Sequence, residues 1–329
     1  MPELPEVEVV RAGLAPAVTG ARVLGVEVMD PRALKRHTPL GEVPGSGPGE
    51  GGHGRTLSLE AGRSRAADFE RRMTGRVLAA PLRRGKFLWI PIEGGVGSGA
   101  ASARATGEAP DPSSALLAHL GMSGQMLLRA TDAADDRHVR IRTWIEHPEH
   151  GELRLDFSDQ RLFGSLAIDQ LVAAAPGTIP AQAAHIARDP LDEHFDDEAF
   201  VAALRSRSVG AKKLLLDQRL VSGVGNIYAD ETLWRARVHP DTPGTSLSQR
   251  GAVTLLHHMR EVFAQALAEG GTSFDEQYVN VNGQAGYFAH SLNAYGRGGE
   301  ACPRCGGPIK RVPFAGRSSH FCPRCQRKR

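Results

Sequence analysis

The spacing of apolar residues divides the chain into a strand-rich first part and a helical second part. Near the start, apolar residues recur every three or four positions, which predicts a helix that ends near Gly20. Apolar and polar residues alternate at 139–145 and again at 153–157, which predicts an antiparallel hairpin with one buried face. Further strands are predicted at 22–29, 86–92 and 115–120.

Helical spacing dominates after a Pro/Ala-rich stretch at 173–190, which we interpret as a linker. Ser246 and Gln249 have the spacing of a capping box in front of a long amphipathic helix. Two stretches rich in Gly, Ser and Pro, near 39–65 and 94–114, interrupt the strand-rich part and predict flexible surface insertions.

A shorter helical unit contains a glycine turn. Residues 211–220 and 227–234 predict two helices, and Gly223 and Gly225 between them permit a tight turn and close approach of the backbone to a phosphate. Asn226 is predicted to cap the second helix and leave its free amides facing an anion. Two helices and a glycine turn also form simple packing units, so the pattern alone leaves both interpretations open.

The composition fits a soluble globular protein. The chain has 329 residues, 41% of them hydrophobic and 23% charged, enough for two or three domains. No apolar run approaches the ~18 residues of a membrane span, and the start lacks the pattern of a signal peptide. We therefore expect a cytoplasmic protein without a membrane partner.

All four cysteines lie near the end of the chain. Two C-x-x-C pairs with sixteen residues between them are formed by Cys302, Cys305, Cys322 and Cys325. The spacing predicts one tetrahedral Zn²⁺ site, with an iron site or a redox pair as the alternatives. Four thiolates leave no open coordination position, so the zinc is expected to be structural, and no organic cofactor is expected.

The same segment is strongly basic. From residue 297 onward there are nine Lys or Arg residues and one acid, a net charge of +8 in a chain whose total is +3. This predicts an anionic partner, most often nucleic acid, although a merely solubilising tail is also consistent with it. Arg317 follows Gly316 where a hairpin between the cysteine pairs would turn, which suits bidentate phosphate contact as well as a solvated turn.

The first residues carry possible chemistry. Removal of Met1 exposes the secondary amine of Pro2, and an α-amine with a pKa near ~7.7–8.0 is partly nucleophilic at neutral pH. Such an amine can form a Schiff base with a carbonyl-like carbon, and Glu3 could move the protons. The alternative is an ordinary helix start, with Pro5 in the first turn.

Five separated segments occur in the order and spacing of one family: residues 1–8, 119–124, 159–164, 221–231 and the cysteine-rich end. The chain resembles bacterial formamidopyrimidine-DNA glycosylase, the base-excision enzyme for 8-oxoguanine and ring-opened purines. The resemblance implies an α+β multidomain protein that holds double-stranded DNA between its domains. Its parts would be an N-terminal antiparallel β-sandwich (1–172), a linker (173–190), a helix–two-turn–helix domain (191–292) and a zinc ribbon (293–329).

The resemblance also implies the chemical roles. Pro2 matches the nucleophile that attacks C1′ of the damaged nucleotide, and Glu3 matches the proton donor to the deoxyribose. Lys86, Asn226 and Arg317 match residues that grip DNA phosphates.

Four further residues match positions near the lesion. Lys212 matches a lysine close to the lesion nucleotide. Met122, Arg161 and Phe163 resemble the trio that enters the duplex after the damaged base is flipped out, where methionine fills the void, arginine reads the orphaned cytosine and phenylalanine wedges the stack. Flipping a base leaves a gap whose filling offsets lost stacking, and an apolar wedge suits that task. Without the resemblance, core packing would be the simpler role for Met122 and Phe163.

Residues 271–288 match the family's mobile loop over the flipped base, although Gln284-Ala285 departs from its usual Lys-Pro. The prediction is thus a monomeric bifunctional DNA glycosylase and AP lyase acting on oxidised purines. Two alternatives stay open: an endonuclease VIII-type glycosylase for oxidised pyrimidines, and a non-catalytic DNA-damage-binding protein.

Overall fold

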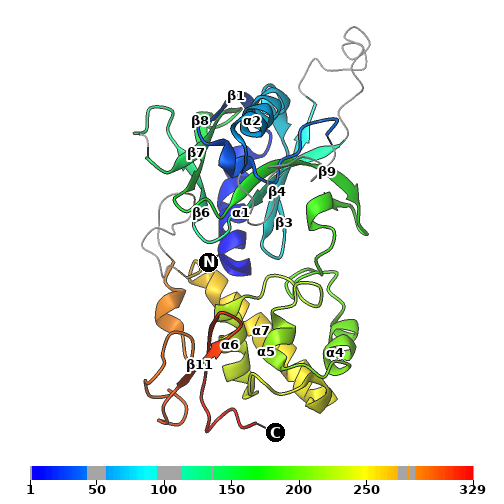
Figure 1. Cartoon of the computed structure of the whole chain (residues 1–329), viewed down its shortest axis with the longest axis vertical. Coiled ribbons are helices and arrows are strands. Elements are labelled where there is room, and N and C mark those ends of the chain that lie inside the picture. Colours follow the sequence, from blue (N-terminus) through cyan, green and yellow to red (C-terminus); the bar gives the residue numbers. More distant parts are fainter. Residues whose placement is uncertain are drawn as a thin grey trace.

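A computed structural model describes residues 2–42, 57–94, 113–134, 136–272, 281 and 286–328. The chain forms a sheet domain and a smaller helical part, drawn above and below each other in Figure 1. The chain start lies between these two parts, at the lower end of the first helix. This location places the residues with predicted amine chemistry at the boundary between the domains.

The sheet domain contains one continuous antiparallel sheet. Its strand order is β10-β9-β5-β4-β2-β1-β7-β8-β6, with β3 paired to β4. The strands are β1 Arg22–Val28, β2 Val77–Leu78, β3 Leu82–Arg84, β4 Phe87–Glu93, β5 Ser114–His119, β6 Gly124–Arg129, β7 Val139–His147, β8 Gly151–Asp159, β9 Ser165–Ala173 and β10 Thr178–Pro180. All of the strands predicted from alternation are confirmed, including the β7–β8 hairpin.

The two halves of this sheet share a hydrophobic core with helices α1 (Leu4–Val18) and α2 (Leu59–Met73). Leu116 of β5 and Ile141 of β7 come from different halves of the sheet and belong to the same core. The apolar face predicted for the first helix is buried there, from Val7 to Val18. The predicted β-sandwich is therefore built from one sheet folded over a helix.

The helical domain packs around Tyr228, which is fully buried against the rings of Phe263 and Phe288. Its helices are α4 (Asp197–Arg205), α5 (Ala211–Leu215), α6 (Asn226–Ala236) and α7 (Gln249–Ala268), with short 3₁₀ turns η3 (Gly244–Ser246) and η4 (Phe288–Ser291). The chain ends in the hairpin β11 (Lys310–Phe314) and β12 (Arg317–Phe321). These parts confirm the α+β multidomain class.

Three local predictions need correction. The helix predicted at 211–220 ends at Leu215, because Asp217 accepts a hydrogen bond from the Arg219 N–H and turns the chain. The cap of α7 is Ser248, which accepts from the Gly251 N–H at 3.0 Å, whereas Ser246 belongs to η3. The predicted linker contains β10 and a 3₁₀ turn, η2 (Ala181–Ala183), so part of it extends the sheet.

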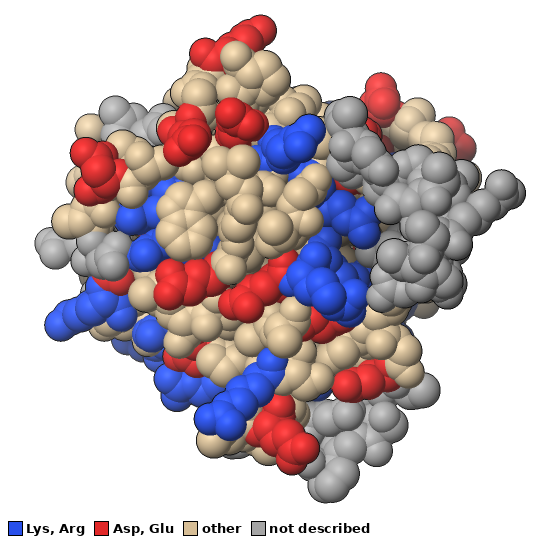
Figure 2. All heavy atoms as spheres, turned by 90° about the horizontal axis from the view of Figure 1, so that it is seen from above, with Lys and Arg blue, Asp and Glu red and all other residues tan. Residues whose placement is uncertain are grey.

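The two predicted insertions lie mostly outside the described residues, at 43–56 and 95–112. The first is shorter than predicted, since residues 59–65 belong to α2. Among the described helices, none is long and apolar enough to cross a membrane. The outer end of the sheet domain carries interspersed acidic and basic side chains around an uncharged centre (Figure 2), not the single-sign field expected of a nucleic-acid surface.

Candidate active site between the domains

The chain start is attached to the glycine turn of the helical domain. Pro2 is buried, and Leu4 donates its N–H to the Gly223 carbonyl at 3.0 Å. Glu3 donates its own N–H to Glu6 Oε2 at 2.8 Å. Residues more than 200 positions apart in the sequence thus meet at the N-terminus of α6, since Gly223 precedes that helix.

The Glu3 carboxylate sits on the N-terminus of α6. It accepts the N–H groups of Gly225 at 2.7 Å and Ile227 at 3.1 Å, and it is 1% exposed. The predicted anion at this turn is therefore Glu3 itself. The predicted cap is wrong, because Gly225 is the N-cap and Asn226 is the first helical residue. A carboxylate satisfies the free amides of a helix start and the positive end of its dipole.

Burial nevertheless controls the protonation of Glu3. Desolvation raises the pKa of this carboxyl above its ordinary value, and nearby Glu6 acts in the same direction. Lys86 and the backbone hydrogen bonds of α6 oppose the shift. A carboxyl with a raised pKa keeps its proton to higher pH, which suits a proton donor.

Gly225 has no space for a side chain, because a Cβ atom there would lie 2.3 Å from the carboxyl carbon of Glu3. We expect Gly225→Ala to push this carboxyl out of place and to slow the predicted glycosylase reaction by about 100-fold, since a displacement near 1 Å can cost that much. Single-turnover excision measures it. Gly251→Ala is the control, because its Cβ would meet only Ser248 Oγ, at 3.2 Å. An unchanged rate in Gly225→Ala would contradict the placement of Glu3.

Lys86 faces the same site from the sheet domain. It follows the β3–β4 turn and donates from Nζ to the Val224 carbonyl at 3.0 Å. Desolvation lowers the pKa of this ammonium, and the Glu3 charge opposes the shift. Lys86, Asn226 and Arg317 line one pocket of about 340 Å³, which brings together the three predicted phosphate-binding residues.

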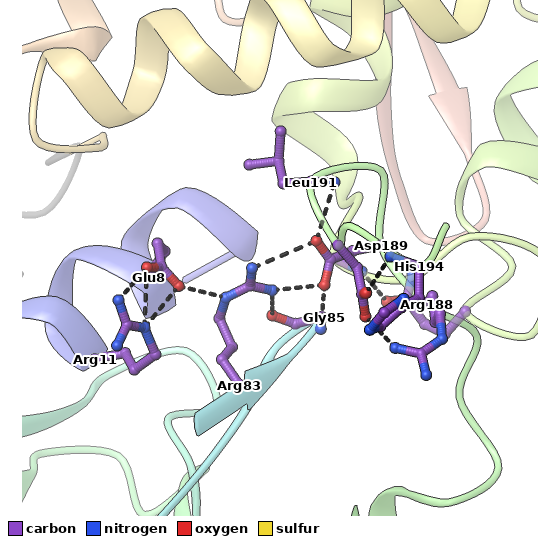
Figure 3. A network of polar contacts seen from close by, with 11 residues as sticks. Glu8, Arg11, Arg83, Gly85, Arg188, Asp189, Leu191 and His194 are labelled. Carbon is purple, nitrogen blue, oxygen red and sulfur yellow. Dashed lines mark hydrogen bonds and ion pairs between the residues drawn. The ribbon is translucent and has the colours of Figure 1, made fainter. Parts of the chain in front are cut away.

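An ion-pair network fixes the turn that presents Lys86 (Figure 3). Arg83 bridges Glu8 of α1, at 2.9 Å, and Asp189 of the interdomain segment, at 2.8 Å. Asp189 also accepts the Gly85 N–H at 3.2 Å. Gly85 has a φ of +55°, which favours glycine, and directly precedes Lys86. The network therefore ties α1, the turn and the interdomain segment to one another.

Arg317 and Lys212 have different surroundings. Arg317 is exposed at the start of β12, as predicted, and also lines a second pocket with Glu3 and Asn226. Lys212 lies fully buried, where its Nζ pairs with Asp230 at 2.7 Å and donates to the Ser318 carbonyl at 3.2 Å. The structure thus places Lys212 beneath the ribbon hairpin.

Met122, Arg161 and Phe163 lie on two adjacent loops of the sheet domain. A Cβ on Gly121 would lie 2.4 Å from the Phe163 backbone, which shows how closely the loops approach. Phe163 is 43% exposed, and the Arg161 guanidinium lies over its ring at 4.8 Å. Asp159 shapes the second loop by accepting the N–H groups of Arg161, Leu162 and Gly164. An exposed phenylalanine on a rigid loop fits the predicted wedge better than core packing.

The four cysteines converge as their spacing predicts. Their sulfur atoms all lie within 4.8 Å of one another. Tetrahedral zinc with Zn–S bonds of ~2.3 Å places its sulfurs about 3.8 Å apart, so the cluster fits the ion. Trp234 Nε1 donates to Cys302 Sγ at 3.4 Å, a contact that orients a zinc ligand from outside the coordination sphere. The residues support a structural zinc that holds the β11–β12 hairpin.

Several residues of this site were not singled out from the sequence. Glu6 accepts from the Tyr228 hydroxyl and from the Thr272 N–H at 2.8 Å. Desolvation raises the pKa of Tyr228 well above its usual value, so the hydroxyl remains a donor. Glu231 accepts the N–H groups of Ala294 at 2.8 Å and Tyr295 at 2.9 Å. Only Glu6 has a local sequence signal, because Glu3 and Glu6 have capping-box spacing.

Known families match nearly every part of the chain. The formamidopyrimidine-DNA glycosylase N-terminal domain matches residues 1–46 and 54–166, and the corresponding H2TH domain matches 186–277. The zinc finger found in FPG and IleRS matches residues 299–327. The N-terminal match is interrupted at 47–53, inside the first predicted insertion.

Curated relatives and solved structures extend over the full length. Formamidopyrimidine-DNA glycosylase from Leifsonia xyli is 54% identical, and the match covers 99% of this chain and all of the relative. The enzyme of a Nocardioides strain is 49% identical over 99% of this chain and 94% of its own. A Lactococcus lactis FPG mutant bound to Fapy-dG-containing DNA has a TM-score of 0.74 at 29% identity, covering 99% of this chain and 100% of that one. The Thermus thermophilus MutM (Fpg) protein has a TM-score of 0.71 at 32% identity, with 100% of both chains covered.

The sheet domain, the helix–two-turn–helix domain and the four-cysteine finger together define a base-excision-repair DNA glycosylase. The chain belongs to the formamidopyrimidine-DNA glycosylase family.

Proposed function

We propose that this enzyme removes 8-oxoguanine and formamidopyrimidines from duplex DNA and then cleaves the resulting abasic site. The observation that carries the proposal is the placement of Glu3, the neighbour of Pro2, on the N-terminus of α6, beside the pocket lined by Lys86, Asn226 and Arg317. Relatives of the same fold have been solved with DNA that contains an abasic site or Fapy-dG. Membership of this family and the charge of the pocket support a DNA substrate.

The chemistry starts at the chain terminus once Met1 is removed. The Pro2 nitrogen attacks C1′, and the glycosidic bond breaks with its electron pair leaving on the base. The proton of the attacking amine passes to the departing base, which frees the nitrogen lone pair for the next step. Glu3 delivers a proton to the sugar ring oxygen as the C1′–O4′ bond opens, which leaves an iminium ion between Pro2 and C1′. The iminium acidifies the C2′ protons, and successive β- and δ-eliminations break the 3′ and 5′ carbon–oxygen bonds.

The remaining residues hold the DNA. Lys86, Asn226 and Arg317 bind phosphates around the flipped nucleotide. The space that the flipped base leaves in the duplex is entered by Met122, Arg161 and Phe163. Lys212 acts from beneath the ribbon, through its contacts with Asp230 and Ser318. One Zn²⁺ on the four cysteines stabilises the ribbon and supplies no step of the reaction. We expect a monomer that acts on chromosomal DNA in the bacterial cytoplasm.

Borohydride trapping tests the reaction. We expect the protein to form a covalent adduct with a duplex that contains 8-oxoguanine opposite cytosine, and peptide mass spectrometry to place the DNA on Pro2. Absence of an adduct together with intact binding would favour a non-catalytic damage-binding protein. Faster excision of thymine glycol than of 8-oxoguanine would favour the endonuclease VIII-type alternative.

A further inference from the structure

One face of α6 holds the zinc-binding segment against the helical domain. Asn226, Asp230 and Trp234 are spaced four residues apart and therefore lie on the same side of the helix. Asn226 Nδ2 donates to the Ser318 carbonyl at 3.0 Å, and Trp234 donates to a cysteine of the first C-x-x-C pair. The ribbon lies alongside this helix in Figure 1, and β12 packs on it.

Asp230 makes the most contacts on this face. Its Oδ1 accepts the Ser319 hydroxyl at 3.0 Å and pairs with Lys212 at 2.7 Å, and its Oδ2 accepts the His320 N–H at 2.8 Å. The Asp230 and Lys212 side chains are both fully buried. A buried carboxylate with three donors is held in one place, because loss of Lys212 would leave its charge without compensation and loss of a neutral donor would leave a lone pair unsatisfied.

These contacts lie directly beside Arg317. Ser318, Ser319 and His320 follow it in β12, and each is bound to a side chain of α5 or α6. Arg317 lines the pocket from the ribbon side, whereas Asn226 lines it from α6. The position of the guanidinium therefore depends on how β12 is seated on the helix.

We propose that Asp230 is a positioning residue for the DNA phosphate clamp: it seats β12 on α6 so that Arg317 faces the pocket shared with Lys86 and Asn226. The proposal rests on the proposed function, in which Arg317 binds phosphate. Asp230 does not touch DNA, since its side chain is buried beneath the hairpin.

A double-mutant cycle tests this role. The probe is a duplex with a tetrahydrofuran abasic-site analogue, bound by the zinc-loaded full chain. In the wild-type background, Arg317→Ala is expected to weaken binding by roughly 10-fold, as for loss of a hydrogen bond to a charged group. In the Asp230→Asn background the same change is expected to cost less than about 2-fold, because the guanidinium is no longer in place.

The salt dependence of binding supplies an independent readout. The slope of log K against log salt is negative, and each lost phosphate contact reduces its magnitude by about 0.9. Arg317→Ala and Asp230→Asn should each reduce the magnitude of the slope by that amount, and the double variant should reduce it no further. Equal costs of Arg317→Ala in both backgrounds, or an unchanged slope in Asp230→Asn, would overturn the proposal.

Two further variants protect the test. Asp230→Asn leaves the buried Lys212 ammonium without its countercharge. Zinc content and thermal melting would reveal whether the domain unfolds as a result. In that case Ser319→Ala replaces Asp230→Asn in the double-mutant cycle, because it removes one hydrogen bond to Asp230 and keeps both charges. If Arg317→Ala weakens binding equally in the wild-type and Ser319→Ala backgrounds, the proposal is rejected. Asp197→Asn is the control, because it breaks an ion pair with Arg260 in the same domain away from the ribbon. Failure of wild type to bind the duplex would instead refute the proposed function.

Discussion

A chain that begins with one extra glycine before Pro2 is expected to lose covalent trapping and strand cleavage by roughly 10⁴-fold or more, the scale seen when a catalytic nucleophile is removed. The extension places the proline nitrogen in a peptide bond, where its lone pair is delocalised. The new primary amine lies about 3.8 Å farther along the chain, away from the atom that must be attacked. Borohydride trapping and single-turnover cleavage of 8-oxoguanine DNA measure the loss.

The matched control is the same protein without the extra glycine, produced so that its chain begins at Pro2. Both proteins should bind tetrahydrofuran-containing DNA equally, because none of the proposed phosphate contacts changes. Pro2→Gly is expected to retain some trapping, since glycine supplies an amine whose Schiff base carries no permanent charge. Equal trapping by the extended and the Pro2-initiated chains would contradict Pro2 as the nucleophile and indicate another amine, such as Lys86.

Local patterns predicted those parts of the molecule that depend on short sequence separations. The β7–β8 hairpin follows from alternation because one face of each strand is buried in a single core. The cysteine cluster follows from two C-x-x-C turns, since metal ligation requires that spacing. The helical face of α1 follows from the apolar positions that contact the sheet.

The active-site geometry could not be predicted in the same way, because it depends on contacts between distant segments. Asn226 is an ordinary capping residue by type, yet the amides of α6 bind Glu3 from 222 positions away. Lysine is usually found at the protein surface, yet Lys212 is buried because Asp230 neutralises its charge. No periodicity encodes either pairing. Its place beside Pro2 pointed to Glu3, and the resemblance pointed to Lys212, but the physical role of each emerges only from its partners.

Glu3→Gln is expected to slow excision of 8-oxoguanine by roughly 10²–10⁴-fold, the usual contribution of a general acid. The amide is nearly isosteric and can still accept the Gly225 or Ile227 N–H, so the helix start stays occupied, but it has no proton to deliver to the sugar. Cleavage of a preformed abasic site should fall less, because that sugar already opens to an aldehyde and needs no displacement of a base. Comparison of the two substrates separates loss of the acid from general damage, and Glu152→Gln on an exposed part of β8 is the control.

The pH dependence of the wild-type enzyme follows from the same group. Burial raises the Glu3 pKa, so the acid form persists to higher pH than in an ordinary carboxyl and is lost as the pH rises through that value. The Pro2 amine must be unprotonated to attack, so the rate also falls at low pH. Excision should therefore show a bell-shaped profile whose high-pH limb reports Glu3. The residual activity of Glu3→Gln should lack that limb while keeping the low-pH limb. A high-pH limb that persists in the glutamine variant would assign the proton donor to a different residue.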